Sequence, residues 1–431
     1  MQKYYVDFTD KIPPNVILAL APKLSSDSSL HTMIGDLNPT ISKSLSATTI
    51  PIVSKKTWWS CHKDVLRSSS NYFKSIFNSQ LHEVEVSIVF LPNGIFSASV
   101  LDIMLYYMYN KSIFIEDETD IEVLQSLYLA SDYLGLESLC ATIEQHITIN
   151  LAHSFNCYCE NCITIVPFLL SFAGSNQQNN PSLSKMVQSI VKLLIQDPER
   201  VLSTFWTSQS MVTLLTQNPE MELLHEYLEN GLLKHVNKSN AIECLFGCFL
   251  AEEVLIKKRK EFQTKLLEGT IQKVRESGSC ILANKFDFYC TKYPKLLSCV
   301  DGITYSFDFL NYMMSVILDQ QMNERNACLL YEGVVKHLMC RHTFQNSPLV
   351  RTILQSAKEK IIKYISSNII TIKKLDLIDQ TIIDSLTHGK NDNNITKQEQ
   401  EINLKSINRS HNTSRCFNRA RRSETQTKYY R

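Results

Sequence analysis

The sequence predicts an α+β domain over residues 46–148, followed by an all-α region over residues 181–386 that is a helical bundle or resembles an α-solenoid. β-rich runs occur only between residues 48 and 115, whereas apolar residues at helical spacing continue from residue 182 to about residue 385. Glycine is scarce, with 11 residues in 431, against a usual share of roughly 7%. Because phosphate-binding loops and doubly wound nucleotide folds need glycine, this scarcity argues against such enzymes and favours helices.

Polar segments precede, connect and follow these two parts. Residues 1–45 are rich in Ser, Thr and Asp, and we expect them to be mostly disordered, with one short helix over residues 16–20. Residues 149–180 form a Cys-rich linker. Residues 387–431 form a disordered basic tail, which contains ten Lys/Arg and four Asp/Glu.

The first domain alternates strands and helices. Residues 48–53 and 57–61 are β-rich around a short polar connection, which predicts a hairpin, and Pro51 makes its first strand an edge or irregular strand. Residues 60–77 then predict two short helices, with Ser70 or Asn71 capping the second. The remaining elements expected in order are a strand at 84–91, a helix at 99–109, a short strand at 113–115, and helices at 120–131 and 134–147 joined at Gly135.

Three motifs of this segment resemble those of the BTB/POZ domain family. They are carried in order by His62, Val65, Leu66, Ser70, Tyr72 and Phe73; by Tyr106, Tyr109 and Ile113; and by Ala130, Asp132, Tyr133, Leu134 and Leu139. The aspartate that usually begins the first long strand of the family would fall near Thr49, and the usual glycine after the tyrosine motif is Lys111 or Ser112. The missing aspartate argues against the family's charged dimer pocket.

Most of the large side chains in these motifs are expected to be core rather than functional residues. We expect Leu66, Phe73, Phe77, Leu105, Tyr109, Leu127, Tyr133 and Leu134 in the core. His62 is expected to be a buried, hydrogen-bonded structural histidine and not a catalyst.

A tripeptide after the two short helices suggests a partner. In BTB proteins that recruit a cullin scaffold, a hydrophobic-x-Glu triplet occupies this place, and here it is Leu81, His82 and Glu83. The resemblance implies that Leu81 fills a hydrophobic groove and that Glu83 fixes the register. The alternative is an ordinary polar loop with one half-buried leucine.

The linker contains a potential metal site. Cys157, Cys159 and Cys162 lie within six residues, and His153 lies four residues before them. Three thiolates and one imidazole are the ligand set of a structural zinc ion, which would hold the linker together without doing chemistry. The alternatives are a polar loop with reduced cysteines, or thiols close enough to oxidise.

The all-α region reads as successive helices without a repeat of fixed period. The helices are expected at residues 182–196, 220–235, 241–274, 306–320, 323–339 and 349–370, with breaks at Pro198, Pro219, Ser277–Gly278, Pro294 and Pro348. The basic run 257–260 is expected on a solvated helix face rather than on nucleic acid.

The cysteine content and the basic cluster bear on where the protein is located in the cell. No signal peptide or membrane-spanning run is present, and 13 cysteines without a secretory signal indicate reduced thiols in cytoplasm or nucleus. A loose basic cluster near the end of the chain would serve as a nuclear import signal, as a non-specific RNA contact or simply as a solvated tail; its residues are Arg415, Arg419, Arg421 and Arg422.

No enzyme signature is present, so we expect a non-catalytic interaction protein. The first hypothesis is a BTB-mediated adaptor that recruits substrates to a cullin-RING ubiquitin ligase, with a homodimer formed through the BTB-like domain. The second is a BTB-dimerised nuclear scaffold or transcription-associated regulator. A third is a redox- or metal-responsive protein centred on residues 157–162.

Overall fold

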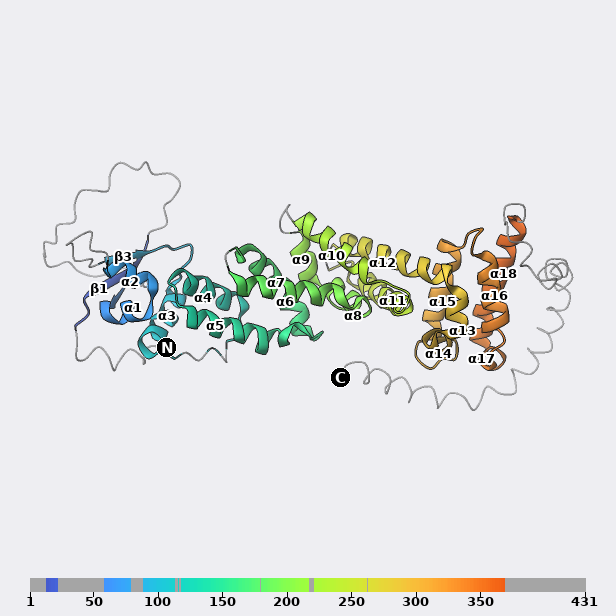
Figure 1. The fold of residues 1–431 in the computed structure, drawn as a ribbon, viewed down its shortest axis with the longest axis horizontal. Coiled ribbons are helices and arrows are strands. Elements are labelled where there is room, and N and C mark those ends of the chain that lie inside the picture. The colour runs from blue at the N-terminus through green and yellow to red at the C-terminus, as the bar shows by residue number, and fades with distance from the viewer. Residues whose placement is uncertain are drawn as a thin grey trace, which may run out of the picture. The chain divides into compact units, whose positions relative to one another are not determined.

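The computed structural model describes residues 13–21, 58–78, 88–112, 115, 118–178, 180–216, 221–261 and 263–368 (Figure 1). They belong to two compact units. The first unit contains residues up to 195 together with residues 208–228, and the second contains residues 196–207 and those from 229 onward. Within the described ranges, no helix is long and apolar enough to cross a lipid bilayer.

A three-stranded sheet with the strand order β2-β1-β3 organises the first unit. Its strands are β1 (Val16–Leu20), β2 (Trp58–Cys61) and β3 (Ile88–Leu91). β1 pairs with β2 in the antiparallel sense and with β3 in the parallel sense, so it is the central strand. Alternate side chains are buried throughout β2 and β3 and over the first four residues of β1, as the period of two in a half-buried sheet requires.

The helix expected over residues 16–20 is wrong, because this segment is the central strand. Its sequence, VILAL, alternates in burial, and its backbone partners are segments about 40 and 70 residues further along the chain. The hairpin partner expected for β2, residues 48–53, lies outside the described residues. The antiparallel neighbour that the structure gives to β2 is β1.

The helices of this domain agree closely with the predicted positions. They are α1 (Lys63–Ser69), α2 (Asn71–Asn78), α3 (Ala98–Asn110), α4 (Ile121–Tyr133) and α5 (Glu137–Gln145). Ser70 separates α1 from α2 as expected: its hydroxyl accepts from the Phe73 amide at 3.2 Å and donates to the Leu134 carbonyl at 2.6 Å. Gly135 separates α4 from α5 with φ of +66°.

The predicted core of the domain is largely confirmed. The chain buries Leu66, Phe73, Leu105, Leu127 and Leu134 fully or nearly so. Phe77 and Tyr109 are half-buried. The prediction is wrong for Tyr133, which is 38% exposed, because it ends α4 and its ring packs at the domain's edge against Tyr72 and Phe96.

Further helices of the first unit are α6 (Glu160–Asn176), α7 (Pro181–Gln196) and α9 (Gln209–Thr216), and α10 (Met221–His235) spans the boundary between the units. The second unit contains α8 (Pro198–Ser203), α11 (Ala241–Lys258), α12 (Lys265–Asn284), α13 (Phe286–Lys292), α14 (Pro294–Val300), α15 (Phe307–Val316), α16 (Ala327–Glu332), α17 (His342–Asn346) and α18 (Pro348–Ser367). Pro198, Pro294 and Pro348 each stand at a helix start, where the missing N–H costs nothing.

Two sequence expectations for the second unit are wrong. The helix expected over residues 241–274 is divided after Lys258, and α11 and α12 form an antiparallel pair. The break expected at Ser277–Gly278 lies inside α12, where Gly278 faces the Ala241 carbonyl. A glycine there permits close approach of the two helices, so its role is in packing rather than in a turn. Beyond α11, Arg259 pairs with Glu268 at 2.9 Å, in keeping with a solvated basic run.

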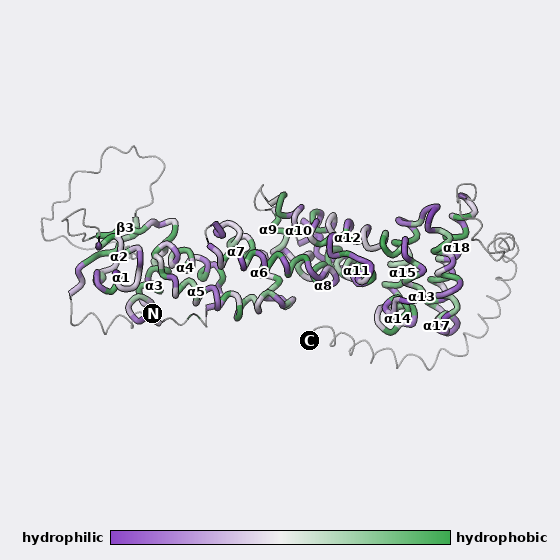
Figure 2. Tube along the Cα trace, in the orientation of Figure 1, coloured by the Kyte–Doolittle hydropathy of each residue, from purple (hydrophilic) through white to green (hydrophobic). Residues whose placement is uncertain are grey.

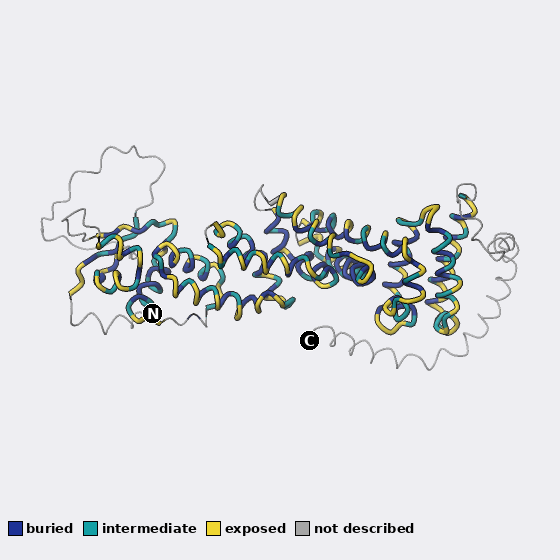
Figure 3. The backbone as a smooth tube through the Cα atoms, viewed as in Figure 1, coloured by how far each residue is buried: buried dark blue, intermediate teal, exposed yellow. Residues whose placement is uncertain are grey.

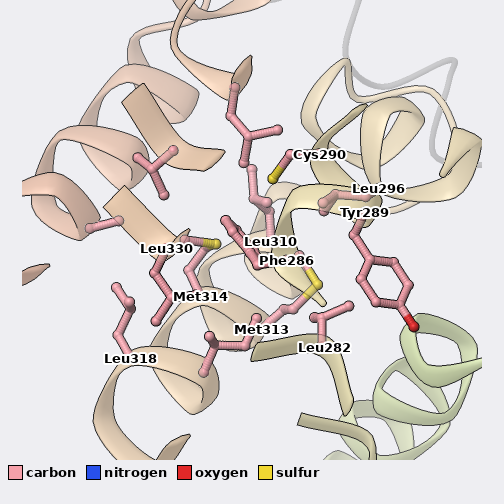
Figure 4. Packing of buried hydrophobic residues seen from close by; sticks show 14 of the residues in the cluster. Leu282, Phe286, Tyr289, Cys290, Leu296, Leu310, Met313, Met314, Leu318 and Leu330 are labelled. Atoms are coloured by element: carbon pink, nitrogen blue, oxygen red, sulfur yellow. The ribbon is translucent and has the colours of Figure 1, made fainter. Parts of the chain in front are cut away.

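The second unit has its own apolar core. Hydrophobic and hydrophilic residues alternate along its helices (Figure 2), and buried and exposed positions follow the same alternation (Figure 3). Figure 4 shows side chains from several helices meeting in this core, among them Phe286, Leu310, Met313 and Leu330. The Tyr289 ring extends from the cluster, and its hydroxyl donates to the Lys238 carbonyl at 2.6 Å.

Candidate metal centre and interaction domain

The four predicted metal ligands lie around one unusual turn. The π-helical segment η1 (His146–Leu151) follows α5 directly and leads into the turn η2 (His153–Phe155), after which α6 begins at Glu160. His153, Ser154 and Phe155 have φ of 46°, 56° and 55°. None is glycine or asparagine, and three successive residues in this left-handed region cost about 3–6 kcal/mol at roughly 1–2 kcal/mol each.

The turn brings the four side chains together. Their potential ligand atoms, one from each of His153, Cys157, Cys159 and Cys162, all lie within 4.8 Å of one another. The Nδ1 atom of His153 is 3.6 Å from the Cys159 sulfur and 3.5 Å from the Cys162 sulfur. Cys162 is buried, Cys157 and Cys159 are half-buried, and His153 is exposed, so the cluster lies at the surface with one side in the protein.

These distances fit a tetrahedral zinc site. Zinc binds cysteine sulfur at about 2.3 Å and histidine nitrogen at about 2.0–2.1 Å, which places S and N ligands about 3.5 Å apart in a tetrahedron. The observed separations from the His153 nitrogen agree with that value. Because four protein ligands complete the coordination of zinc, such a site is structural and leaves no position for a substrate.

Neighbouring groups favour a thiolate in the cluster. Burial raises the pKa of the Cys159 thiol, but hydrogen bonds from the Cys162 amide and from neighbouring side chains outweigh it and lower the pKa to about 7. Burial and the nearby thiols raise the pKa of Cys162. Cys159 therefore ionises before Cys162, and the thiolate is the form that binds metal.

The cluster is tied to both adjoining elements. The Asn161 side-chain amide donates to the Leu151 carbonyl at 3.2 Å, which connects the first turn of α6 to the end of η1. Cys159 occupies the N-cap position of α6 and Cys162 lies in its first turn. His146, in η1, is buried, and its Nε2 atom is 2.8 Å from the Glu118 carbonyl oxygen. Sequence spacing predicted the donor set, but no glycine or asparagine indicated the left-handed turn.

His62 has the structural role expected for it. It is 7% exposed, and its backbone N–H donates to the Tyr109 hydroxyl at 2.9 Å. Its Nδ1 atom is also 2.9 Å from that hydroxyl. These contacts connect the end of β2 to α3.

Several predicted site residues lie outside the described residues. They are Leu81, His82 and Glu83 of the proposed cullin-binding triplet and Arg415, Arg419, Arg421 and Arg422 of the basic cluster. The triplet falls in the connection between α2 and β3.

Sequence reasoning missed the residue that begins the first strand. The structure places Asn15, rather than a residue near Thr49, directly before β1. The Asn15 side-chain oxygen accepts from the Lys63 backbone N–H at 2.8 Å, and the Asn15 backbone N–H donates to the Cys61 carbonyl at 3.0 Å. The available signal was the short apolar run VILAL, but such a run does not distinguish a strand from a helix.

Residues 40–151 match the BTB/POZ domain family. The protein therefore carries a BTB/POZ domain, a class of protein-interaction domain that commonly dimerises, and a mostly helical region follows it. The resemblance seen in the three sequence motifs is confirmed.

Among known proteins, the chain is similar to "Kelch repeat and BTB domain-containing protein 2" of Homo sapiens and of Pongo abelii. Each relative is 27% identical to this chain over 141 residues, which are 33% of this chain. The aligned part spans only 20% of each relative's length.

Proposed function

We propose that this protein is a non-catalytic adaptor that recruits substrates to a cullin-RING ubiquitin ligase in the cytoplasm or the nucleus. The observation that carries the proposal is the BTB/POZ domain at residues 40–151, joined to a long helical region. In this arrangement the domain binds the ligase scaffold and forms a homodimer, while the helical region holds the target. The likeness to a kelch-repeat and BTB protein supports an adaptor role.

The scaffold-binding element is the triplet Leu81, His82 and Glu83 between α2 and β3. A leucine side chain placed in a partner's hydrophobic groove is the kind of anchor that dominates binding energy, and a neighbouring carboxylate sets orientation. The middle residue of the triplet contributes no required side chain.

Affinity capture from cell lysate tests this role. The wild-type chain is expected to recover a cullin. The double variant L81A/E83A is expected to recover at least tenfold less cullin, because truncating an anchor residue costs about 2 kcal/mol or more of binding free energy. The single variant H82A is the matched control and is expected to retain the cullin. Failure of the wild type to recover any cullin, or retention by L81A/E83A, would contradict the proposal and favour the BTB-dimerised nuclear scaffold.

We also propose that His153, Cys157, Cys159 and Cys162 hold one structural zinc ion. The soft sulfur and imidazole donors and their mutual separations support this assignment. When bound, zinc supplies a cross-link between the turn η2 and the start of α6. The four residues bind and orient; they perform no reaction.

Metal analysis of the purified full chain tests the zinc assignment. Under reducing conditions the wild type is expected to contain about one zinc per chain, and the C157S/C159S variant to contain almost none, because two of four ligands are removed. Cys140 lies in the same unit outside the cluster, so C140S is the control and should keep the metal. Equal zinc in C157S/C159S and the wild type would rule out this site.

A further inference from the structure

The turn η2 is poorly supported by the contacts of its own residues. Ser154 is exposed, and His153 is exposed apart from its approach to the two sulfurs. The backbone contacts are local ones, such as the Phe155 amide donating to the Ala152 carbonyl at 2.9 Å. Burial of the Phe155 side chain also stabilises the turn. Burial of one phenylalanine is worth about 1.5–3 kcal/mol, so it offsets only part of the cost of three left-handed residues without glycine.

The left-handed turn also directs the histidine. It places His153 Nδ1 against sulfurs that belong to the N-terminus of α6, so the side chain spans from the turn to the helix. An ion bound among these four atoms would join both segments and favour the strained backbone. Binding energies of structural zinc sites far exceed the cost of such a turn.

We propose that the turn η2 and the zinc ion form one two-state element: the turn folds when zinc binds and opens when zinc leaves. This inference rests on the proposed zinc site. The consequence is that zinc controls the junction between the BTB/POZ domain and the first helix after it, because Cys159 and Cys162 anchor the start of α6.

The effect of zinc is confined to this junction. The far part of α6 has independent contacts with α4, where the rings of Tyr128 and Phe172 meet edge to face at 6.0 Å. Asn180, directly before α7, donates to the Tyr128 hydroxyl at 2.9 Å. The BTB/POZ core around Leu105 and Leu127 is buried without any help from the cluster. Zinc loss therefore opens the turn η2, while the Asn161–Leu151 hydrogen bond, the domain on one side and the helices on the other persist.

Replacement of Ser154 by glycine separates a metal-induced turn from one that forms without metal. Glycine adopts φ of +56° at little cost, so S154G relieves strain only in the state that contains the turn. We expect S154G to bind zinc about fivefold more tightly than the wild type in a chelator-competition titration of the full chain. Hydrogen exchange of residues 146–164 without zinc should be the same in both proteins.

Asn156 provides the matched control, because it lies in the same loop with φ of −126°. Glycine relieves no strain there, so N156G should not tighten zinc binding. In the wild type, removing zinc should speed hydrogen exchange of residues 146–164 at least tenfold and leave α3 and α4 unchanged.

Two results are decisive against the inference. If S154G slows exchange in the zinc-free protein and leaves zinc affinity unchanged, the turn exists without metal and the proposed coupling is wrong, although the zinc site stands. If the wild type binds no zinc, the site itself is wrong and the coupling with it.

Discussion

Replacement of Phe73 by alanine is expected to lower the free energy of unfolding of the BTB/POZ domain by about 3–5 kcal/mol. Phe73 is fully buried, and its ring meets Tyr72 edge to face at 5.4 Å and stacks on Phe77 at 5.9 Å. Alanine would forfeit these contacts and leave a cavity that a close-packed core fills poorly. A loss of this size is a large part of the stability of an ordinary domain.

Phe90 is the matched control, because the same side chain is 60% exposed on β3 of the same domain. F90A is expected to change stability by no more than about 0.5 kcal/mol. Native-state hydrogen exchange of α3 and α4 measures both variants in the full chain without assuming that the two units unfold together. Similar losses for F73A and F90A would contradict the assignment of Phe73 to the core.

Replacement of Gly247 by alanine is expected to destabilise the second unit by about 3 kcal/mol. A Cβ atom at this position would lie 2.7 Å from the Glu199 carbonyl oxygen and 2.9 Å from the Glu199 Cα. Both atoms belong to the backbone of α8, so no side chain can rotate away and α8 must shift from α11. The glycine is therefore required by helix contact, not by its conformational freedom.

Gly269 provides the opposite case in α12 of the same unit, since a Cβ atom there would meet nothing within 4 Å. G269A is expected to stabilise the unit by about 1 kcal/mol, because alanine has the higher helix propensity. Hydrogen exchange of α11 and α12 in both variants gives the comparison. A neutral G247A would show that α8 and α11 are not packed as closely as the structure indicates.

The donor set of the candidate metal centre was predictable from sequence, and its geometry was not. Spacing alone selected His153, Cys157, Cys159 and Cys162, because soft ligands close together in a chain are a chemical pattern. The orientation of His153 depends on a left-handed turn at residues with no propensity for it. In the proposed zinc site, coordination across the cluster rather than local preference would favour that backbone.

By itself, the sequence determined the elements whose causes are local. Ser70 ends α1 and caps α2, Gly135 separates α4 from α5, and prolines begin α8, α14 and α18, because capping and φ restriction act within a few residues. The spacing of the three BTB/POZ motifs belongs to the same group.

Only the tertiary structure decided the features that depend on distant partners. β1 is a strand because β2 and β3 complete its hydrogen bonds, although a short apolar run in polar surroundings also suits a helix. Gly278 continues α12 rather than ending it, because α11 packs against it. Burial and backbone pairing with segments tens of residues away override local propensity. A local sequence pattern could not predict these features, because it contains no information about the distant segment that packs against it.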